Sequence, residues 1–306
     1  MSITRRKFLA SSAAATALGL TSTSCSTDKP DPDGWDRGPL RHLIPVVSHR
    51  SLHIKASFEE PRADAPVLRV GSREVAGSRT DTAGRFWAFR MTDLPPATEH
   101  SLQLRDTSGG ALCDPWPLRT FPSPDASPER LRVVSYSCTG GISTPIPPSI
   151  YEPFRSPEYR SRLFDLALDM KPDLVIANGD HVYYDISQIS RMQGHFLQGL
   201  ILRVLKNVSY RFDDTAPVFG GANEESLIGV GDDQIAQIYG VRFRSTPVFF
   251  ITDDHDYFEN DDATPEIVTF PPAPFHVALR HGLQQLYFPE FPADDPLPAD
   301  IPGVGT

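Results

Sequence analysis

The sequence predicts a small all-β module followed by an α/β domain. Residues 40–122 contain short alternating or apolar runs separated by Gly, Pro and Asp, which is the pattern of a small β-sandwich. From Leu131 onward, apolar runs suited to buried strands alternate with helical patterns, which is typical of strand–helix–strand units. We therefore expect a β-sandwich over residues 40–122 and an α/β domain over residues 130–306, with a hinge between them.

The amino-terminal segment, residues 1–28, has the features of a twin-arginine (Tat) export signal. Arg5 and Arg6 precede an apolar stretch, residues 10–20, that is too short to span a bilayer. Tat substrates usually fold before export, often around a metal. We therefore expect the Tat export machinery as a partner, and a periplasmic or extracellular location.

Cys25 stands where a lipoprotein would carry its acceptor cysteine. Ser22, however, occupies the position at which such signals have an aliphatic residue. The sequence therefore leaves a lipid anchor through Cys25 open. Residues 29–39, which are rich in Pro, Asp and Gly, are expected to form a linker before the first domain.

Composition narrows the classes of function. The 306 residues carry a formal net charge of −10, and no basic patch with interleaved aromatic residues is visible, which argues against a nucleic-acid-binding surface. Apolar residues make up 40% of the chain, which is ample for the cores of two domains. The three cysteines, Cys25, Cys113 and Cys138, do not form a disulfide framework. Cys113 is expected to be a small buried apolar residue.

Four strands are predicted in the β-module, each an alternating or apolar run that ends at turn residues. They span residues 52–58, 67–70, 86–91 and 100–104. The Leu94-Pro-Pro turn before the last of them resembles the corner that leads into a late strand of fibronectin type III-like domains. No residue cluster in this module suggests chemistry.

The first helix of the α/β domain has recognisable start and stop signals. It should begin with Ser156 as the cap and Pro157 at the first helical position, and end at Lys171-Pro172. Its predicted apolar stripe consists of Leu163, Phe164, Ala167 and Met170.

A strand over residues 174–177 follows this helix at once. The strands on either side of the helix form a βαβ unit, so they should be parallel and lie side by side. A third strand is expected directly before Asp253. Further helices are predicted over residues 189–208, 232–239 and 274–287, the first of them a packed helix or a lid rather than a membrane span.

Polar clusters follow three of the predicted strands. They are Ser137-Cys138, Gly179-Asp180-His181-Val182-Tyr183 and Asp253-Asp254-His255-Asp256. An α/β sheet binds ligands outside the carboxyl ends of its strands, so three such ends in one chain predict a metal site. Asp180 is the candidate for a carboxylate that bridges two cations.

Tyr183 follows Asp180 closely enough to bind the same metal. Tyr184 competes for this role, because neighbours in an extended segment point to opposite faces. From the residues alone, a buried core position is the favoured interpretation of both Cys138 and Tyr183. The sequence pattern by itself therefore identifies the location of the site better than its ligands.

Taken together, the three motifs resemble the successive metal motifs of the PhoD-type alkaline phosphatases, which are calcineurin-like metallophosphatases. A twin-arginine signal and an amino-terminal β-sandwich before the catalytic domain are also features of this family. The resemblance implies that Cys138 and Tyr183 supply a thiolate and a phenolate to Fe³⁺. Asp254 stands where most metallophosphatases carry Asn, and a carboxylate there suits Ca²⁺, whose shell Asn260 would complete.

The same resemblance assigns the catalytic roles. His255 would lie near the phosphate of a phosphoester substrate and stabilise charge or protonate the leaving oxygen. Asp256 would orient that imidazole by holding its other nitrogen. His181 and Asp185, which flank the second motif, are weaker candidates. Three further histidines on helical segments are expected to be packing or surface residues: His195, His276 and His281.

The chain also departs from the family pattern. Metallophosphatases of this class complete the site with later histidines, but after Asp256 only His276 and His281 remain, and neither follows an apolar strand. We therefore expect the amino-terminal half of a metallophosphatase domain, truncated at its carboxyl end, with little or no phosphatase activity by itself. Two alternatives stay open: a non-catalytic exported protein that binds calcium or a partner, and a purple acid phosphatase-like hydrolase. The latter family would have Asp in place of Cys138.

Overall fold

The computed structural model describes residues 34–139, 141, 156–183, 210–253, 255–257 and 274–290. The chain divides into two compact units, Met1–Trp35 and Asp36–Thr306, and every element named below belongs to the second. Within the described part of the chain, no helix is long and apolar enough to cross a membrane. The predicted helix over residues 189–208 and the amino-terminal signal lie outside the described residues.

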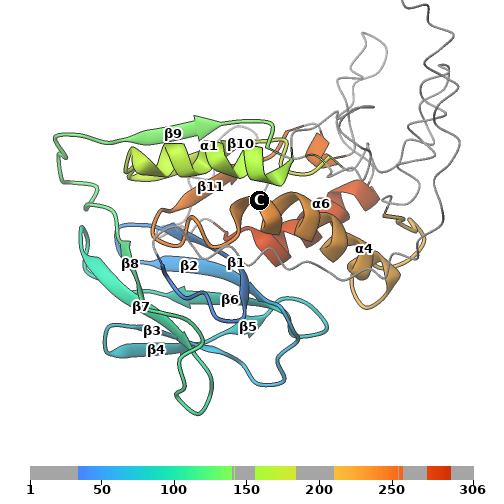
Figure 1. Ribbon diagram of the computed structural model, residues 1–306, viewed down its shortest axis with the longest axis horizontal. Helices are drawn as coiled ribbons and strands as arrows, with labels where there is room; N and C mark the ends of the chain where they lie inside the picture. Colours follow the sequence, from blue (N-terminus) through green and yellow to red (C-terminus); the bar gives the residue numbers. More distant parts are fainter. Residues whose placement is uncertain are drawn as a thin grey trace, which may run out of the picture. The chain divides into compact units, whose positions relative to one another are not determined.

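Residues 40–119 fold into two antiparallel four-stranded sheets (Figure 1). The first has the order β1 (Leu40–Val47), β2 (Leu52–Phe58), β6 (Phe86–Met91) and β5 (Ser78–Arg79). The second has the order β4 (Arg73–Ala76), β3 (Val67–Val70), β7 (Glu99–Arg105) and β8 (Trp116–Arg119). The predicted strands correspond to β2, β3, β6 and β7.

Strand β1 was not predicted, although most of its residues are buried. It contains Pro45, which has no N–H to donate to a sheet, so the run does not resemble a central strand. In the structure β1 pairs only with β2 within its sheet, and an edge strand tolerates proline. Beyond this edge, the Leu43 N–H donates to the Gly240 carbonyl, 2.9 Å away.

The α/β part contains a three-stranded parallel sheet of order β11-β10-β9 (Figure 1). Its strands are β9 (Val133–Tyr136), β10 (Leu174–Asn178) and β11 (Val248–Ile251). Ala177 of β10 aligns with Tyr136 on one side and Phe250 on the other. The prediction that the three motif-bearing strands are parallel neighbours is confirmed, and their carboxyl ends meet at one edge.

Helix α1 (Pro157–Asp169) connects β9 to β10 and has Pro157 in its first turn, as predicted. Ser156 is the N-cap residue but makes no side-chain capping bond. The predicted apolar stripe was wrong in part. Phe164 is buried, whereas Leu163 and Met170 are 68% and 66% exposed.

The side of α1 that faces the core is the side that carries Phe164. Phe164 packs against Tyr136 of β9 and against Tyr239 and Phe243. Adjacent positions on a helix lie about 100° apart, and in α1 the side that buries Phe164 leaves its neighbour Leu163 exposed.

A continuous helical segment precedes β11. It consists of α4 (Ala222–Gly231), a five-residue π-helix η3 (Asp232–Ala236) and α5 (Gln237–Tyr239). The prediction began this helix at residue 232, just after Gly229 and Gly231, and glycines lower helix propensity. In the structure Gly231 is a packing residue, since a Cβ there would lie 2.2 Å from a ring carbon of Tyr287. Helix α6 (Pro274–Tyr287) has the predicted bounds.

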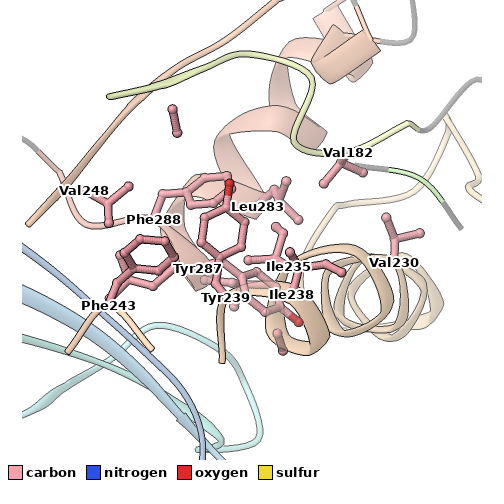
Figure 2. Packing of buried hydrophobic residues seen from close by; sticks show 14 of the residues in the cluster. Val182, Val230, Ile235, Ile238, Tyr239, Phe243, Val248, Leu283, Tyr287 and Phe288 are labelled. Carbon is pink, nitrogen blue, oxygen red and sulfur yellow. The ribbon is translucent and has the colours of Figure 1, made fainter. Parts of the chain in front are cut away.

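The described residues share one large hydrophobic cluster, part of which Figure 2 shows. Tyr239, Tyr287 and Phe243 are fully or almost fully buried within it, next to Ile235 and Ile238 of the helical segment. Two members come from the first antiparallel sheet, Ile44 of β1 and Phe86 of β6.

The first sheet also makes polar contacts with the end of α6. His42 Nε2 lies 2.9 Å from the Tyr287 carbonyl, and the Lys55 ammonium donates to the Gln285 carbonyl at 2.8 Å. These side chains satisfy carbonyls that the last turn of a helix leaves without partners. The β-module therefore contributes to the core and to the helix termini that support the parallel sheet.

Candidate functional site

Cys138 and Asp180 meet at the carboxyl edge of the parallel sheet. Cys138 follows β9, Asp180 follows β10, and the Cys138 thiol donates to Asp180 Oδ2 at 2.9 Å. The Cys138 side chain is exposed, whereas Asp180 is only 6% exposed. The pair thus joins a solvent-accessible sulfur to a buried carboxylate.

Both residues hold a left-handed backbone conformation, with φ of +62° at Cys138 and +57° at Asp180. This region costs an L-residue about 1–2 kcal/mol, and cysteine, unlike asparagine or aspartate, is not enriched there. Residues held in such conformations cluster at functional sites. Two of the candidate ligands therefore share this uncommon conformation, which among the described residues also occurs at Asp93, Ala97 and Lys171.

Tyr183 joins the same cluster. Its hydroxyl donates to Asp180 Oδ2 at 3.2 Å, and its side chain is 9% exposed. Burial raises the pKa of Tyr183 well above its ordinary value, and the neighbouring Cys138 and Asp180 raise it further. The His255 imidazole lies against the phenol ring, with centroids 4.1 Å apart. The competing Tyr184 lies outside the described residues.

The Asp256 side chain, which is 2% exposed, accepts hydrogen bonds from both the loop after β10 and the segment after β11. Its Oδ1 accepts from the N–H groups of His181 (2.9 Å) and Val182 (3.0 Å). Its Oδ2 accepts from the N–H groups of Asp180 (3.0 Å) and Asp253 (3.1 Å). A carboxylate offers about four lone-pair sites, so these bonds use its full capacity.

This arrangement differs from the role expected for Asp256, which was to orient the His255 imidazole. Among the described residues, the hydrogen bonds of Asp256 all come from backbone N–H groups. The carboxylate holds the Asp180 backbone in place instead. Such a role needs a particular three-dimensional loop arrangement and has no spacing signature in the sequence.

Gly179 allows the two loops to approach each other. Its φ is +84°, and a Cβ at this position would lie 2.3 Å from Asp253 Cβ. Glycine is therefore required twice over, for backbone conformation and for space. The close approach of Asp253 explains why glycine precedes Asp180 after β10.

The loop that carries Cys138 is held by neighbouring helices. Arg160 of α1 donates from Nη1 to the Thr139 carbonyl at 2.8 Å. The Thr139 hydroxyl lies 3.2 Å from the hydroxyl of Tyr239, which also accepts from Tyr136 at 2.6 Å. Cys138, whose sulfur is exposed, therefore lies in a loop that is hydrogen-bonded to Arg160 and Tyr239 through Thr139.

Sequence reasoning missed one polar residue of the site, Gln234. It lies on the π-helix η3 and is fully buried. Its Oε1 accepts from the N–H groups of Gly141 and Tyr183, each at 2.9 Å. The sequence gives no signal for this role, because a π-helix leaves no recognisable pattern in it.

The remaining candidates fall into two groups. Asp254 and Asn260, the proposed calcium ligands, lie outside the described residues, as do Asp185 and His195. His181 is buried as a packing residue, with Nε2 2.8 Å from the Ile251 carbonyl and its ring against Phe250 and Phe288. His276 and His281 lie on α6, as expected of helical positions.

The residues present fit one cation. A thiol, a carboxylate and a phenol converge on Asp180 Oδ2, and each becomes an anionic donor on losing a proton. A positive ion would reverse the unfavourable effect of the neighbouring acids on Tyr183. In the described part of the chain, no group of three or more His, Cys, Asp or Glu side chains could hold a metal ion, so the cluster reaches three donors through its tyrosine.

No protein-family model matches the chain, and no curated protein matches it either. Among solved structures it is similar to PhoD, with 14% identity and a TM-score of 0.41 over 80% of this chain and 44% of that one. It is also similar to a purple acid phosphatase from yellow lupin (Lupinus luteus) seeds, with 15% identity and a TM-score of 0.37 over 72% of this chain and 42% of that one. The chain thus spans less than half the length of either phosphatase.

A third similar structure is a small domain. The fn3 domain of the human collagen α-1(XX) chain covers 38% of this chain and 98% of its own length, with 17% identity and a TM-score of 0.21. These identities and TM-scores are too low to assign the chain to a family.

Proposed function

We propose that this chain is an exported, metal-dependent phosphoester hydrolase of the PhoD type, in which Cys138, Asp180 and Tyr183 hold one cation. One observation carries the proposal: a thiol and a phenol both donate to Asp180 Oδ2 at the carboxyl ends of adjacent parallel strands. The backbone strain at Cys138 and Asp180 supports it, because a core cysteine would gain nothing from such a conformation.

Iron(III) is the proposed ion at these residues, since a trivalent cation stabilises the anionic thiolate, phenolate and carboxylate forms of these side chains, and iron accepts both thiolate and tyrosinate ligands. Such an ion would act as a Lewis acid on a phosphoryl oxygen and lower the pKa of bound water. Asp254 and Asn260 are the proposed ligands of a calcium ion.

His255 is the proposed general acid. Its ring lies against Tyr183, so it borders the cluster on the side of the loop after β11. From that position an imidazolium could donate a proton to the leaving oxygen of a phosphoester or stabilise charge on the phosphoryl group. Asp256 would support this chemistry indirectly, by fixing the backbone that carries Asp180.

The proposal extends to the location of the protein. Export by the Tat machinery is proposed from Arg5, Arg6 and the apolar segment that follows them. A lipid anchor would require Cys25 as its acceptor. A reporter fused after residue 39, expressed with Arg5 and Arg6 replaced by Lys, tests export: secretion that persists in this variant would contradict the assignment.

The metal site is tested by binding rather than by turnover. Titration of the purified chain with Fe³⁺ should produce a visible absorption band from thiolate- and phenolate-to-iron charge transfer, and Asp180→Asn or Cys138→Ser should abolish it. Cys113→Ala is the matched control, because Cys113 is buried in the β-module and burial raises its pKa to about 11. An identical titration for Asp180→Asn and the unmodified chain would defeat the proposal.

Catalysis is tested with a chromogenic phosphomonoester and a phosphodiester, with Fe³⁺ and Ca²⁺ supplied. Any turnover should require both Asp180 and His255. Rapid hydrolysis that survives Asp180→Asn would show that the activity arises elsewhere.

A further inference from the structure

Gln234 connects the two loops that carry the proposed iron ligands. Its side-chain oxygen accepts one hydrogen bond from Gly141, in the loop after Cys138, and one from Tyr183 itself. Both donors lie 2.9 Å away, and the glutamine is fully buried. An amide oxygen has two lone pairs, so a single atom satisfies one N–H from each loop.

Gln234 also completes a row of backbone contacts. The N–H groups of Asp180, His181 and Val182 are all accepted by Asp256, and the next N–H, that of Tyr183, is accepted by Gln234. The entire turn from the carboxylate ligand to the phenol ligand is therefore held by two buried side chains. One of them belongs to the loop after β11, and the other to the helical segment.

The element that carries Gln234 is rigidly placed. Ile235 and Ile238, on the same helical segment, are fully buried in the hydrophobic cluster (Figure 2). The π-helical turn at Asp232–Ala236 is a rare conformation, and such turns occur often at functional sites. Gln234 thus links the core of the domain to the loops at the sheet edge.

We propose that Gln234 is a positioning residue, which fixes the separation of the Cys138 loop and the Asp180–Tyr183 turn and so sets the affinity of the cluster for its cation. This inference rests on the proposed function, because it concerns the site formed by Cys138, Asp180 and Tyr183. Loss of an outer hydrogen-bond partner of metal ligands typically costs about 10- to 100-fold in metal affinity.

The test compares two buried substitutions on the same helical segment. Gln234→Met keeps the length of the side chain but removes the acceptor. Ile238→Val trims the core nearby, and Ile238 belongs to the hydrophobic cluster rather than to the loop contacts of Gln234. Both are measured at a temperature where each variant is fully folded. Fe³⁺ affinity is read from the charge-transfer band, and amide hydrogen exchange of the metal-free chain is read at Gly141 and Tyr183.

Gln234→Met should lose at least about tenfold in Fe³⁺ affinity and in amide protection at both positions, while Ile238→Val stays within about threefold of the unmodified chain. Equal affinities in all three proteins would overturn the inference and leave the proposed function standing. Equal losses in both variants would also overturn it, since the effect would then follow stability.

Absence of iron binding in the unmodified chain would instead reject the proposed function, and the inference with it. If Gln234→Met does not fold, Gln234→Asn takes its place, because it keeps the amide and withdraws it by one methylene. Its Fe³⁺ affinity should fall in the same direction, and an affinity equal to that of the unmodified chain would contradict the positioning role.

Discussion

Replacement of Cys138 by glycine and by alanine measures the backbone strain at the candidate site. Cys138 holds φ at +62°, where an L-residue is disfavoured and glycine is not. Both substitutions remove the thiol and its hydrogen bond to Asp180. The difference in unfolding free energy between the two variants therefore reports the backbone conformation alone.

The magnitude follows from two opposing terms. Relief of the left-handed conformation gains about 1–2 kcal/mol for glycine over alanine. Glycine loses about 0.5–1 kcal/mol more backbone entropy on folding. The difference of these terms spans about 0–1.5 kcal/mol, so Cys138→Gly should be more stable than Cys138→Ala by roughly 0.75 kcal/mol, the reverse of the usual order.

Urea unfolding of both variants at neutral pH provides the measurement, with the change in midpoint converted by a common m-value. Ser135 is the matched control, because it lies in the neighbouring strand β9 and is also exposed. There alanine should be more stable than glycine by about 0.5–1 kcal/mol. The same order of stability at both positions would refute the assignment of strain to Cys138.

Three further predictions concern the supporting structure, all measured by urea unfolding. Burial lowers the pKa of His42 from 6.5 to about 4, so its contribution is complete above pH 6.5 and is lost as the pH falls toward 4. Protonation of His42 should lower the free energy of unfolding by about 2–3 kcal/mol between pH 7.5 and 4.5, and His42→Gln should flatten this pH dependence. An unchanged slope of the unfolding free energy against pH would contradict the assignment to His42. Glu224 accepts two hydrogen bonds from Thr82, which join α4 to the β-module, and a third from Gly220, so Glu224→Ala should cost about 3 kcal/mol. Glu225→Ala, at an exposed neighbour, should stay within about 0.5 kcal/mol. Phe164→Ala should cost about 3–4 kcal/mol and Leu163→Ala less than about 0.5; similar costs within either pair would show that burial is misassigned.

The location of the site could be predicted because it depends on sheet topology. Apolar runs before Cys138, Asp180 and Asp253 indicate buried strands, and a helix between the first two requires a parallel pair. Parallel neighbours bring their carboxyl ends to one edge. The convergence of these segments follows from topology, whatever the exact contacts are.

The contacts within the site could not be predicted, because they join side chains to distant backbone groups. The position of Asp256 in the sequence does not indicate that its carboxylate oxygens accept hydrogen bonds from the N–H groups of the turn after β10. Gln234 lies in a segment whose apolar pattern predicts an ordinary helix, and a π-helix rotates the side chains that follow it. Phe164 and Leu163 illustrate the same limit, since both are apolar and only tertiary packing selects the buried one.

The arrangement of hydrogen bonds has a consequence for how the site would bind a metal. The N–H of Asp180 and the three that follow are bonded to Asp256 and Gln234, so contacts within the domain hold Asp180 in its left-handed conformation. The cost of placing the ligands is therefore met by the folding of the domain rather than by metal binding. Preorganisation of this kind raises affinity without adding a ligand. Metal affinity at the cluster should accordingly depend on the helical segment and on the loop after β11 as much as on the donors themselves.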